Sequence, residues 1–214
     1  KELICSDNLL SIGEYAFAGC KKLEKVTIGA DKVKYGQYAF TDCEKLTSFR
    51  VNAAVIPAGM FYQCEALKEI TIGKDVNDIG EFAFRETAVD KFIFEDGNPA
   101  FKAQGDKLIL SADGKKLMAV APAYKGEFTE AELEGAEISV IGKAAFSHAT
   151  KITSIVLEDV TVIEAYGLAS SEGVEKVKFG SLMEIGEYAF FEAPITELPS
   201  FTKDTIIGKY AFAN

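Results

Sequence analysis

The residue types that most often carry chemistry are few in this chain, and their spacing argues against a reactive site. There are four cysteines and one histidine among 214 residues. Cys20, Cys43 and Cys64 stand 23 and 21 residues apart, whereas zinc sites place two cysteines two to four residues apart and usually add histidines. We therefore predict no metal site and no cofactor, and interpret these cysteines as small buried residues.

Catalytic arrangements are also missing from the sequence. Any histidine-based triad would have to use His148, and the adjacent Ser147 lies in no nucleophile-elbow context, so a loop histidine is favoured over a general base. Gly114-Lys115 lacks the preceding glycine and following hydroxyl residue of a phosphate-binding loop. The segment 95–98, Glu-Asp-Gly-Asn, lacks the regular oxygen-ligand spacing of an EF-hand. We predict that the chain is not an enzyme.

A recurring Ala-Phe dipeptide explains the cysteine spacing. Its second residue defines an anchor position, and Met60-Phe61 and Gly167-Leu168 take the place of the dipeptide in two repeats. The anchor then recurs every 21–23 residues apart from one step of 62. This period indicates a solenoid of stacked repeats, with long surfaces for binding. The anchors are Phe17, Phe40, Phe61, Phe84, Phe146, Leu168, Phe190 and Phe212.

Other positions of the repeat predict how each coil is built. An apolar triplet spaced L-x-x-L-x-L, such as Leu46, Phe49 and Val51, predicts a strand with one buried face. A glycine four residues before the anchor suits either a positive φ or close approach between coils. An aromatic residue two before the anchor forms either a packing column or a binding stripe. For the remaining side of the coil we expect one turn of 3₁₀- or α-helix, or a tight loop.

These columns resemble the BspA-type leucine-rich repeat family, also called the Treponema pallidum class, with the approximate pattern I-G-x-x-A-F-x-x-C-x-x-L-x-x-V-x-I. Residues 12–28 match it closely, and the resemblance covers most of the chain. It implies an α/β repeat solenoid: a right-handed leucine-rich repeat with a parallel β-sheet and short helical or 3₁₀ turns. It also implies a bacterial cell-surface or secreted adhesin that binds host proteins or other cells.

The 62-residue step predicts an irregular insertion. Asp113-Gly114 stands between two apolar segments, 107–110 and 116–120, which is a strong hairpin signal. The hairpin would either project from the solenoid or extend its sheet. We predict one leucine-rich repeat domain over residues 1–214, with repeat blocks 1–94 and 138–214 around an insertion at 95–137, and interpret it as a fragment of a longer protein.

In-register coils place equivalent strand residues roughly 5 Å apart. That distance alone permits a disulfide between coils, but parallel side chains keep the Cβ atoms farther apart than such a bridge prefers. We therefore favour a ladder of free thiols, with disulfides as the alternative.

The outward positions of the predicted strands form the candidate protein-binding face. They carry mixed and mildly basic side chains within an acidic chain, which suggests an acidic or polar protein partner. They are Lys25, Thr27, Ser48, Arg50, Glu69, Thr71, Lys91, Ile93, Ser154, Val156, Lys176 and Lys178.

The net charge of −10 disfavours nucleic acid and anionic membrane as partners, and no apolar run is long enough to span a bilayer. The expected function is non-catalytic binding of a protein, such as a host extracellular or matrix protein, outside the cell or at its surface. The alternatives are a structural spacer and an accessory domain of a larger secreted enzyme. The sequence does not indicate an oligomeric state.

Overall fold

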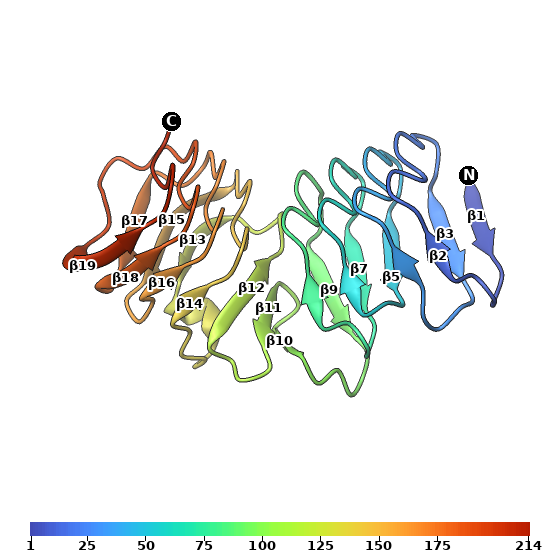
Figure 1. The fold of residues 1–214 in the computed structure, drawn as a ribbon, viewed down its shortest axis with the longest axis horizontal. Helices are drawn as coiled ribbons and strands as arrows, with labels where there is room; N and C mark the ends of the chain where they lie inside the picture. Colours follow the sequence, from blue (N-terminus) through green and yellow to red (C-terminus); the bar gives the residue numbers. More distant parts are fainter. The chain divides into compact units, whose positions relative to one another are not determined.

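The computed structural model describes residues 1–214 as a series of stacked coils, in which strands alternate with tight turns (Figure 1). The chain divides into two compact units, residues 1–107 and 108–214, and each is described by itself. The division falls within the segment 95–137 that the sequence marks as irregular. No helix in the structure is long and apolar enough to cross a membrane.

In the N-terminal unit, each apolar triplet ends in a four-residue strand, and in every coil but the last a two-residue strand follows it. The longer strands pair in parallel in the orders β1-β3 and β5-β7-β9, and the short ones in the orders β2-β4 and β6-β8. The strands are β1 (Glu2–Cys5), β2 (Ser11–Ile12), β3 (Lys25–Ile28), β4 (Lys34–Tyr35), β5 (Ser48–Val51), β6 (Val55–Ile56), β7 (Glu69–Ile72), β8 (Asp78–Ile79), β9 (Lys91–Phe94) and β10 (Phe101–Gln104).

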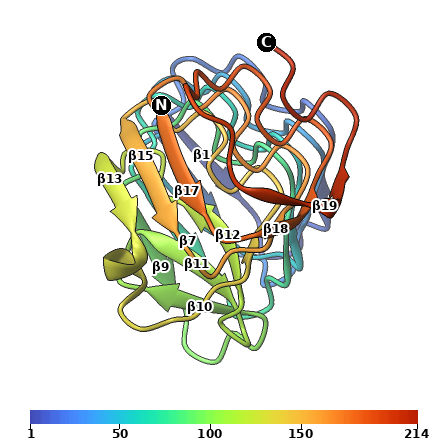
Figure 2. The same cartoon turned by 90° about the vertical axis from the view of Figure 1, so that its left-hand side faces the viewer.

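The C-terminal unit repeats this plan. One parallel sheet has the order β13-β15-β17, whose strands lie side by side in Figure 2, and the second runs through β12, β14, β16, β18 and β19. The elements are β11 (Leu108–Ser111), β12 (Lys116–Val120), β13 (Gly126–Thr129), the 3₁₀-helix η1 (Glu130–Leu133), β14 (Val140–Ile141), β15 (Ile152–Leu157), β16 (Val162–Ile163), β17 (Lys176–Phe179), β18 (Leu182–Ile185) and β19 (Phe201–Ile207).

Alternation within the longer strands explains the core. In β5, Phe49 and Val51 are buried while Ser48 and Arg50 are exposed, as a strand with one buried face requires. The anchor residues pack against these inward side chains and stack on one another; the rings of Phe40 and Phe61, for example, lie 6.3 Å apart. All anchors are buried except the first and last, Phe17 and Phe212, which are partly exposed in the terminal coils.

The turns around the anchors are not helical, so the predicted α/β class is not confirmed. The one helix is η1. Each turn instead places a left-handed residue two positions before the anchor and another two positions after it, as at Tyr38 (φ 54°) and Asp42 (φ 57°). Because helices need consecutive right-handed residues, this alternation reverses the chain without forming one. Parallel strands in stacked coils, the other part of the prediction, are present.

The recurrent glycine serves close approach between coils. None of the glycines four residues before an anchor has a positive φ. A Cβ atom on Gly36 would lie 2.3 Å from the main-chain nitrogen of Glu14, and one on Gly80 would lie 2.4 Å from that of Ala58. A larger residue at either position would therefore push adjacent coils apart, whereas Gly13 in the first coil has nothing within 4 Å of its missing Cβ.

The predicted hairpin is present. Strands β11 and β12 pair antiparallel around Asp113 and Gly114, and Gly114 has a φ of 73°. Because β12 also pairs in parallel with β14, the hairpin extends the second sheet of the C-terminal unit rather than projecting from it. Further along the same segment, β13 adds a strand beside β15, and Thr129 and Glu132 form a reciprocal capping box at η1.

Candidate functional site

The twelve side chains of the candidate binding face all lie on the longer strands, at exposed or half-buried positions. In the N-terminal unit they form rows across the sheet: Ser48, Glu69 and Lys91 are in register in one row. In the C-terminal unit, Ser154 is in register with Lys176, and Val156 with Lys178. Since a parallel ladder fixes the backbone, each row presents its side chains at fixed spacing.

Much of the basic charge on these strands is neutralised by carboxylates from neighbouring coils. The ammonium group of Lys25 lies 3.0 Å from Glu2, and the guanidinium group of Arg50 lies 2.5 Å from Glu95. Hydrogen bonding to Lys25 lowers the pKa of Glu2, and hydrogen bonding to Arg50 lowers the pKa of Glu95. The face therefore carries less net positive charge than its composition suggests.

The C-terminal unit keeps a more distinct basic feature. Lys178 pairs with Glu158, whose hydrogen bond raises the pKa of the lysine. Lys176 has no carboxylate partner and stands beside Lys178 on β17. Both border a hollow of about 500 Å³ over β13, β15 and β17, whose walls also include Ser154, Val156 and Thr196.

Sequence reasoning missed part of this hollow. Glu127 and Glu197 also line it, but Glu127 lies in the segment read as an insertion, and Glu197 follows an imperfect repeat. Once β13 is recognised as the neighbour of β15, Glu127 falls in register with Ser154 on the outward side. The sequence signal for this strand is the alternation of polar and apolar residues in Glu127-Phe128-Thr129, in which Phe128 is fully buried.

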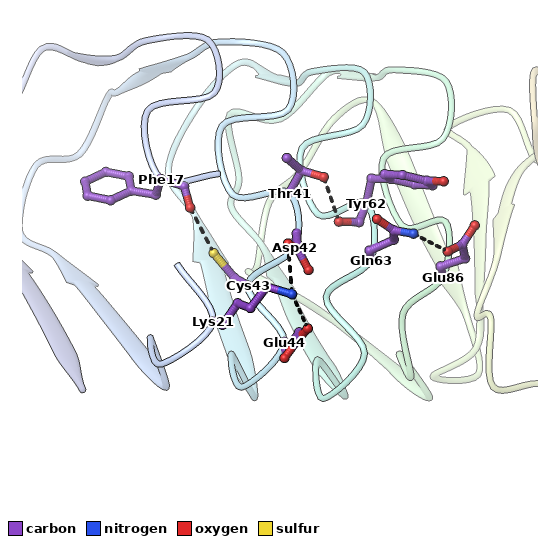
Figure 3. A network of polar contacts seen from close by, with 9 residues as sticks. All are labelled: Phe17, Lys21, Thr41, Asp42, Cys43, Glu44, Tyr62, Gln63 and Glu86. Atoms are coloured by element: carbon purple, nitrogen blue, oxygen red, sulfur yellow. Dashed lines mark hydrogen bonds and ion pairs between the residues drawn. The ribbon is translucent and has the colours of Figure 1, made fainter. Parts of the chain in front are cut away.

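The turn side of the N-terminal unit holds a polar network that runs from coil to coil (Figure 3). The ammonium group of Lys21 lies 3.5 Å from Asp42 and 2.7 Å from Glu44. Further along, the amide of Gln63 donates to Glu86 over 2.9 Å. Every one of these contacts joins neighbouring coils. The network is therefore explained by its role in holding the stacked coils together, without a ligand.

The aromatic column before the anchors is also accounted for by packing. Tyr15 stacks on Tyr38 with ring centroids 5.2 Å apart, and the rings of Tyr166, Tyr188 and Tyr210 follow one another at 5.1 Å. Tyr188 has a stacked ring on each face, and Tyr38 has one on the side of Tyr15, so little of these ring faces remains for a partner. The column is better explained as a ladder between coils than as a binding stripe.

The four cysteines are free thiols in the structure, and no disulfide joins the coils. Cys43 and Cys64 are fully buried. A hydrogen bond with Cys43 and burial both raise the pKa of the Cys64 thiol, which disfavours a reactive thiolate. No group of three or more histidine, cysteine or acidic residues is arranged to hold a metal ion.

Comparison with known protein families finds leucine-rich repeats over most of the chain. The family model described as "BspA type Leucine rich repeat region" matches in six copies, over residues 1–104 and 124–214. No curated protein matches the sequence.

Several solved structures share the fold at low sequence identity. The pneumococcal vaccine antigen PcpA has a TM-score of 0.75 at 19% identity, over 98% of this chain and 58% of that one. A leucine-rich repeat protein from Eubacterium ventriosum has a TM-score of 0.59 at 17% identity, over 99% and 82%. A leucine-rich cell surface protein from Faecalibacterium prausnitzii has a TM-score of 0.55 at 18% identity, over 97% and 70%. This chain thus spans little more than half the length of the PcpA structure.

Proposed function

Because the chain belongs to the BspA-type leucine-rich repeat family, we propose that it is a non-catalytic, adhesin-like binding module that recognises a protein outside the bacterial cell or at its surface. Two of the structurally similar proteins are described as a vaccine antigen and a cell surface protein, which supports that location. The family and these neighbours are repeat proteins of a kind that binds through extended surfaces.

The observation that carries the proposal is the hollow over β13, β15 and β17. Most of its lining residues lie on the hydrogen-bonded strands β13, β15 and β17, so binding there orders little backbone. It combines an apolar wall at Val156 with the two cations Lys176 and Lys178. A partner that offers a carboxylate beside an apolar side chain fits best at Lys176, the cation without a carboxylate partner, because Lys178 is paired with Glu158 and Val156 lies on the same wall.

The test uses a panel of purified extracellular-matrix proteins immobilised on a biosensor. We expect saturable binding of at least one of them, weakened about tenfold or more when Lys176→Glu and Lys178→Glu are combined, a loss of about 1.4 kcal/mol. The matched control combines Lys203→Glu and Lys209→Glu, which make the same charge change at exposed positions outside this sheet, and should bind like the unaltered chain.

Two results would contradict the proposal. If no panel member binds, the role of a structural spacer fits the protein better. If both double variants lose binding equally, net charge rather than the sheet face governs the interaction.

A further inference from the structure

A notch in the N-terminal unit results from one short repeat. The loop between β5 and β6 comprises residues 52–54, whereas the corresponding loops of the neighbouring coils comprise residues 29–33 and 73–77. The short loop accounts for the 21-residue step between the anchors Phe40 and Phe61. Both sheets are also interrupted between its coil and the preceding one. The two longer loops stand beside the short one, and a hollow of about 400 Å³ lies between them.

The floor of this hollow contains a buried amide with one unused acceptor. Asn52 is only 5% exposed. Its Nδ2 donates to the carbonyl oxygen of Ala30 over 3.1 Å, which fixes the orientation of the amide, since a carbonyl can only accept. The Oδ1 atom of Asn52 is buried and has no hydrogen-bond partner. Buried polar atoms are normally paired, so this position favours a ligand that brings a donor.

The walls of the hollow carry more acceptors than donors. The guanidinium group of Arg50 is already held by Glu95, and Lys32 lies 4.0 Å from Asp75. Two further carboxylates, Asp31 and Asp96, form no ion pair, and neither does the third cation of the walls, Lys74, so the hollow has four carboxylates against three cations. An incoming anion would find only Lys74 unpaired, because Arg50 and Lys32 already face Glu95 and Asp75, whereas an incoming cation meets the two unpaired carboxylates.

The loops around the hollow are held in place. Asn98 donates from its Nδ2 to the carbonyl oxygens of Gly73 and Val76, over 3.0 and 2.9 Å, and its Oδ1 accepts from the main-chain nitrogen atoms of Ala100 and Phe101. This one side chain joins the loop after β7 to the segment after β9. The walls are therefore set before any ligand arrives, which lowers the entropic cost of binding.

We propose that this notch is an anchoring pocket for a cationic side chain of a protein partner, with the guanidinium group of arginine as the preferred ligand. Guanidinium presents five donors in a planar fork, which suits acceptors that are spread around a hollow. A bare metal ion would need its ligands gathered at one point, and these carboxylates are not so arranged. The inference rests on the proposed function only in that the cation belongs to a protein.

The test is a titration of the isotopically labelled chain, followed by amide chemical shifts, with the blocked peptide acetyl-Gly-Arg-Gly-amide. We expect saturable shifts at Asn52, Ala53 and Gly73. The corresponding peptide with glutamate in place of arginine should leave these three amides unshifted. Because no protein partner is needed, failure here is separate from failure of matrix-protein binding by the sheet face.

Substitution of the carboxylates tests whether they supply the affinity for the arginine peptide. Combining Asp31→Asn, Asp75→Asn and Asp96→Asn should weaken arginine-peptide binding about tenfold, which corresponds to about 1.4 kcal/mol. The matched control combines Asp78→Asn, Asp90→Asn and Asp106→Asn, exposed positions that do not line the hollow, and should bind within about twofold of the unaltered chain. The single variant Asp31→Asn gives a milder test if the triple variant misfolds.

Three outcomes would overturn the proposal. Shifts at the hollow with the glutamate peptide would indicate an anion site. No localised shifts with the arginine peptide would mean that the hollow takes no such side chain. Equal affinity of the hollow triple variant and the unaltered chain would show that the carboxylates do not select the cation.

Discussion

The thiol of Cys64 donates a hydrogen bond to the main-chain carbonyl oxygen of Phe40, 3.0 Å away in the preceding coil. Cys43 makes the equivalent contact with Phe17 over 3.3 Å. In the C-terminal unit the hydroxyl of Ser171 does the same to the anchor of the coil before it, over 2.6 Å. At Cys43, Cys64 and Ser171, the small residue three positions after the anchor is therefore also a donor that fastens one coil to the next.

This role predicts how Cys64 tolerates replacement. Cys64→Ser keeps a donor of similar size, as Ser171 does, and should leave the free energy of unfolding within about 1 kcal/mol of the original value. Cys64→Val fills the space but removes the donor, and should cost about 1–3 kcal/mol through the lost hydrogen bond and overpacking. Urea denaturation measures both; a valine variant more stable than the serine variant would contradict the donor role.

The anchor column predicts a contrast between inner and terminal coils. Phe40 is fully buried and its ring packs against Phe17, Phe49 and Phe61. Phe40→Ala should lower the free energy of unfolding by about 3–5 kcal/mol. Phe17→Ala removes a ring that is only partly buried and should cost clearly less. Chemical denaturation of the two variants tests this, and a cost below about 1 kcal/mol at Phe40 would contradict its place in the core.

Close approach between coils makes Gly36 and Gly13 a matched pair. A Cβ on Gly36 would lie 2.3 Å from the nitrogen of Glu14, whereas one on Gly13 would meet nothing within 4 Å. Gly36→Ala should therefore destabilise the unit by about 1–3 kcal/mol, because the main chain must shift. Gly13→Ala should be neutral or slightly stabilising, since it only restricts the unfolded chain. Thermal and urea unfolding measure the stability of both variants. Equal changes in stability would rule out the steric explanation.

The strands and the hairpin could be predicted from the sequence alone, but the conformation of the turns could not. The alternation around Phe49 and the turn signal at Asp113-Gly114 predicted strands and a hairpin that the structure contains. The sequence left open whether the turns were helical or tight loops, because nothing in a tyrosine indicates that it will adopt the left-handed backbone of Tyr38, and the structure has tight loops. Residues at such positions are held there by the packing of adjacent coils, which is a tertiary effect.

The charge of the binding face also depends on contacts between coils that the sequence does not reveal. Arg50 and Glu95 lie 45 residues apart in sequence, yet they form an ion pair across the coils. Counting charges along the strands therefore overestimated how basic the face is. The notch at Asn52 was visible as a 21-residue step between anchors, but its unused acceptor depends on where the amide of Asn52 points, which no repeat pattern specifies.

The last prediction concerns Tyr35, whose buried hydroxyl lies near the main chain of Asn52 but makes no hydrogen bond of good geometry. Burial raises the pKa of Tyr35 to about 12, against about 10 for a tyrosine in an unfolded chain. The unfolded chain thus loses this proton at lower pH than the folded chain does. The stability that comes from the neutral phenol is complete below pH 10 and falls as the pH rises towards 12, by at most about 2.7 kcal/mol.

Replacing Tyr35 with phenylalanine isolates this contribution. Tyr35→Phe keeps the edge-on contacts of the ring with Phe40 and Phe49 and removes an unpaired hydroxyl, so at pH 7 the variant should be as stable as the original chain or slightly more so. Between pH 10 and 12 the original chain should lose stability relative to the variant, because only the original has a buried phenol to ionise. Parallel urea denaturations of the two proteins from pH 7 to 12 measure the difference, and a gap that stays constant over this range would mean that Tyr35 ionises equally readily in the folded and unfolded chains.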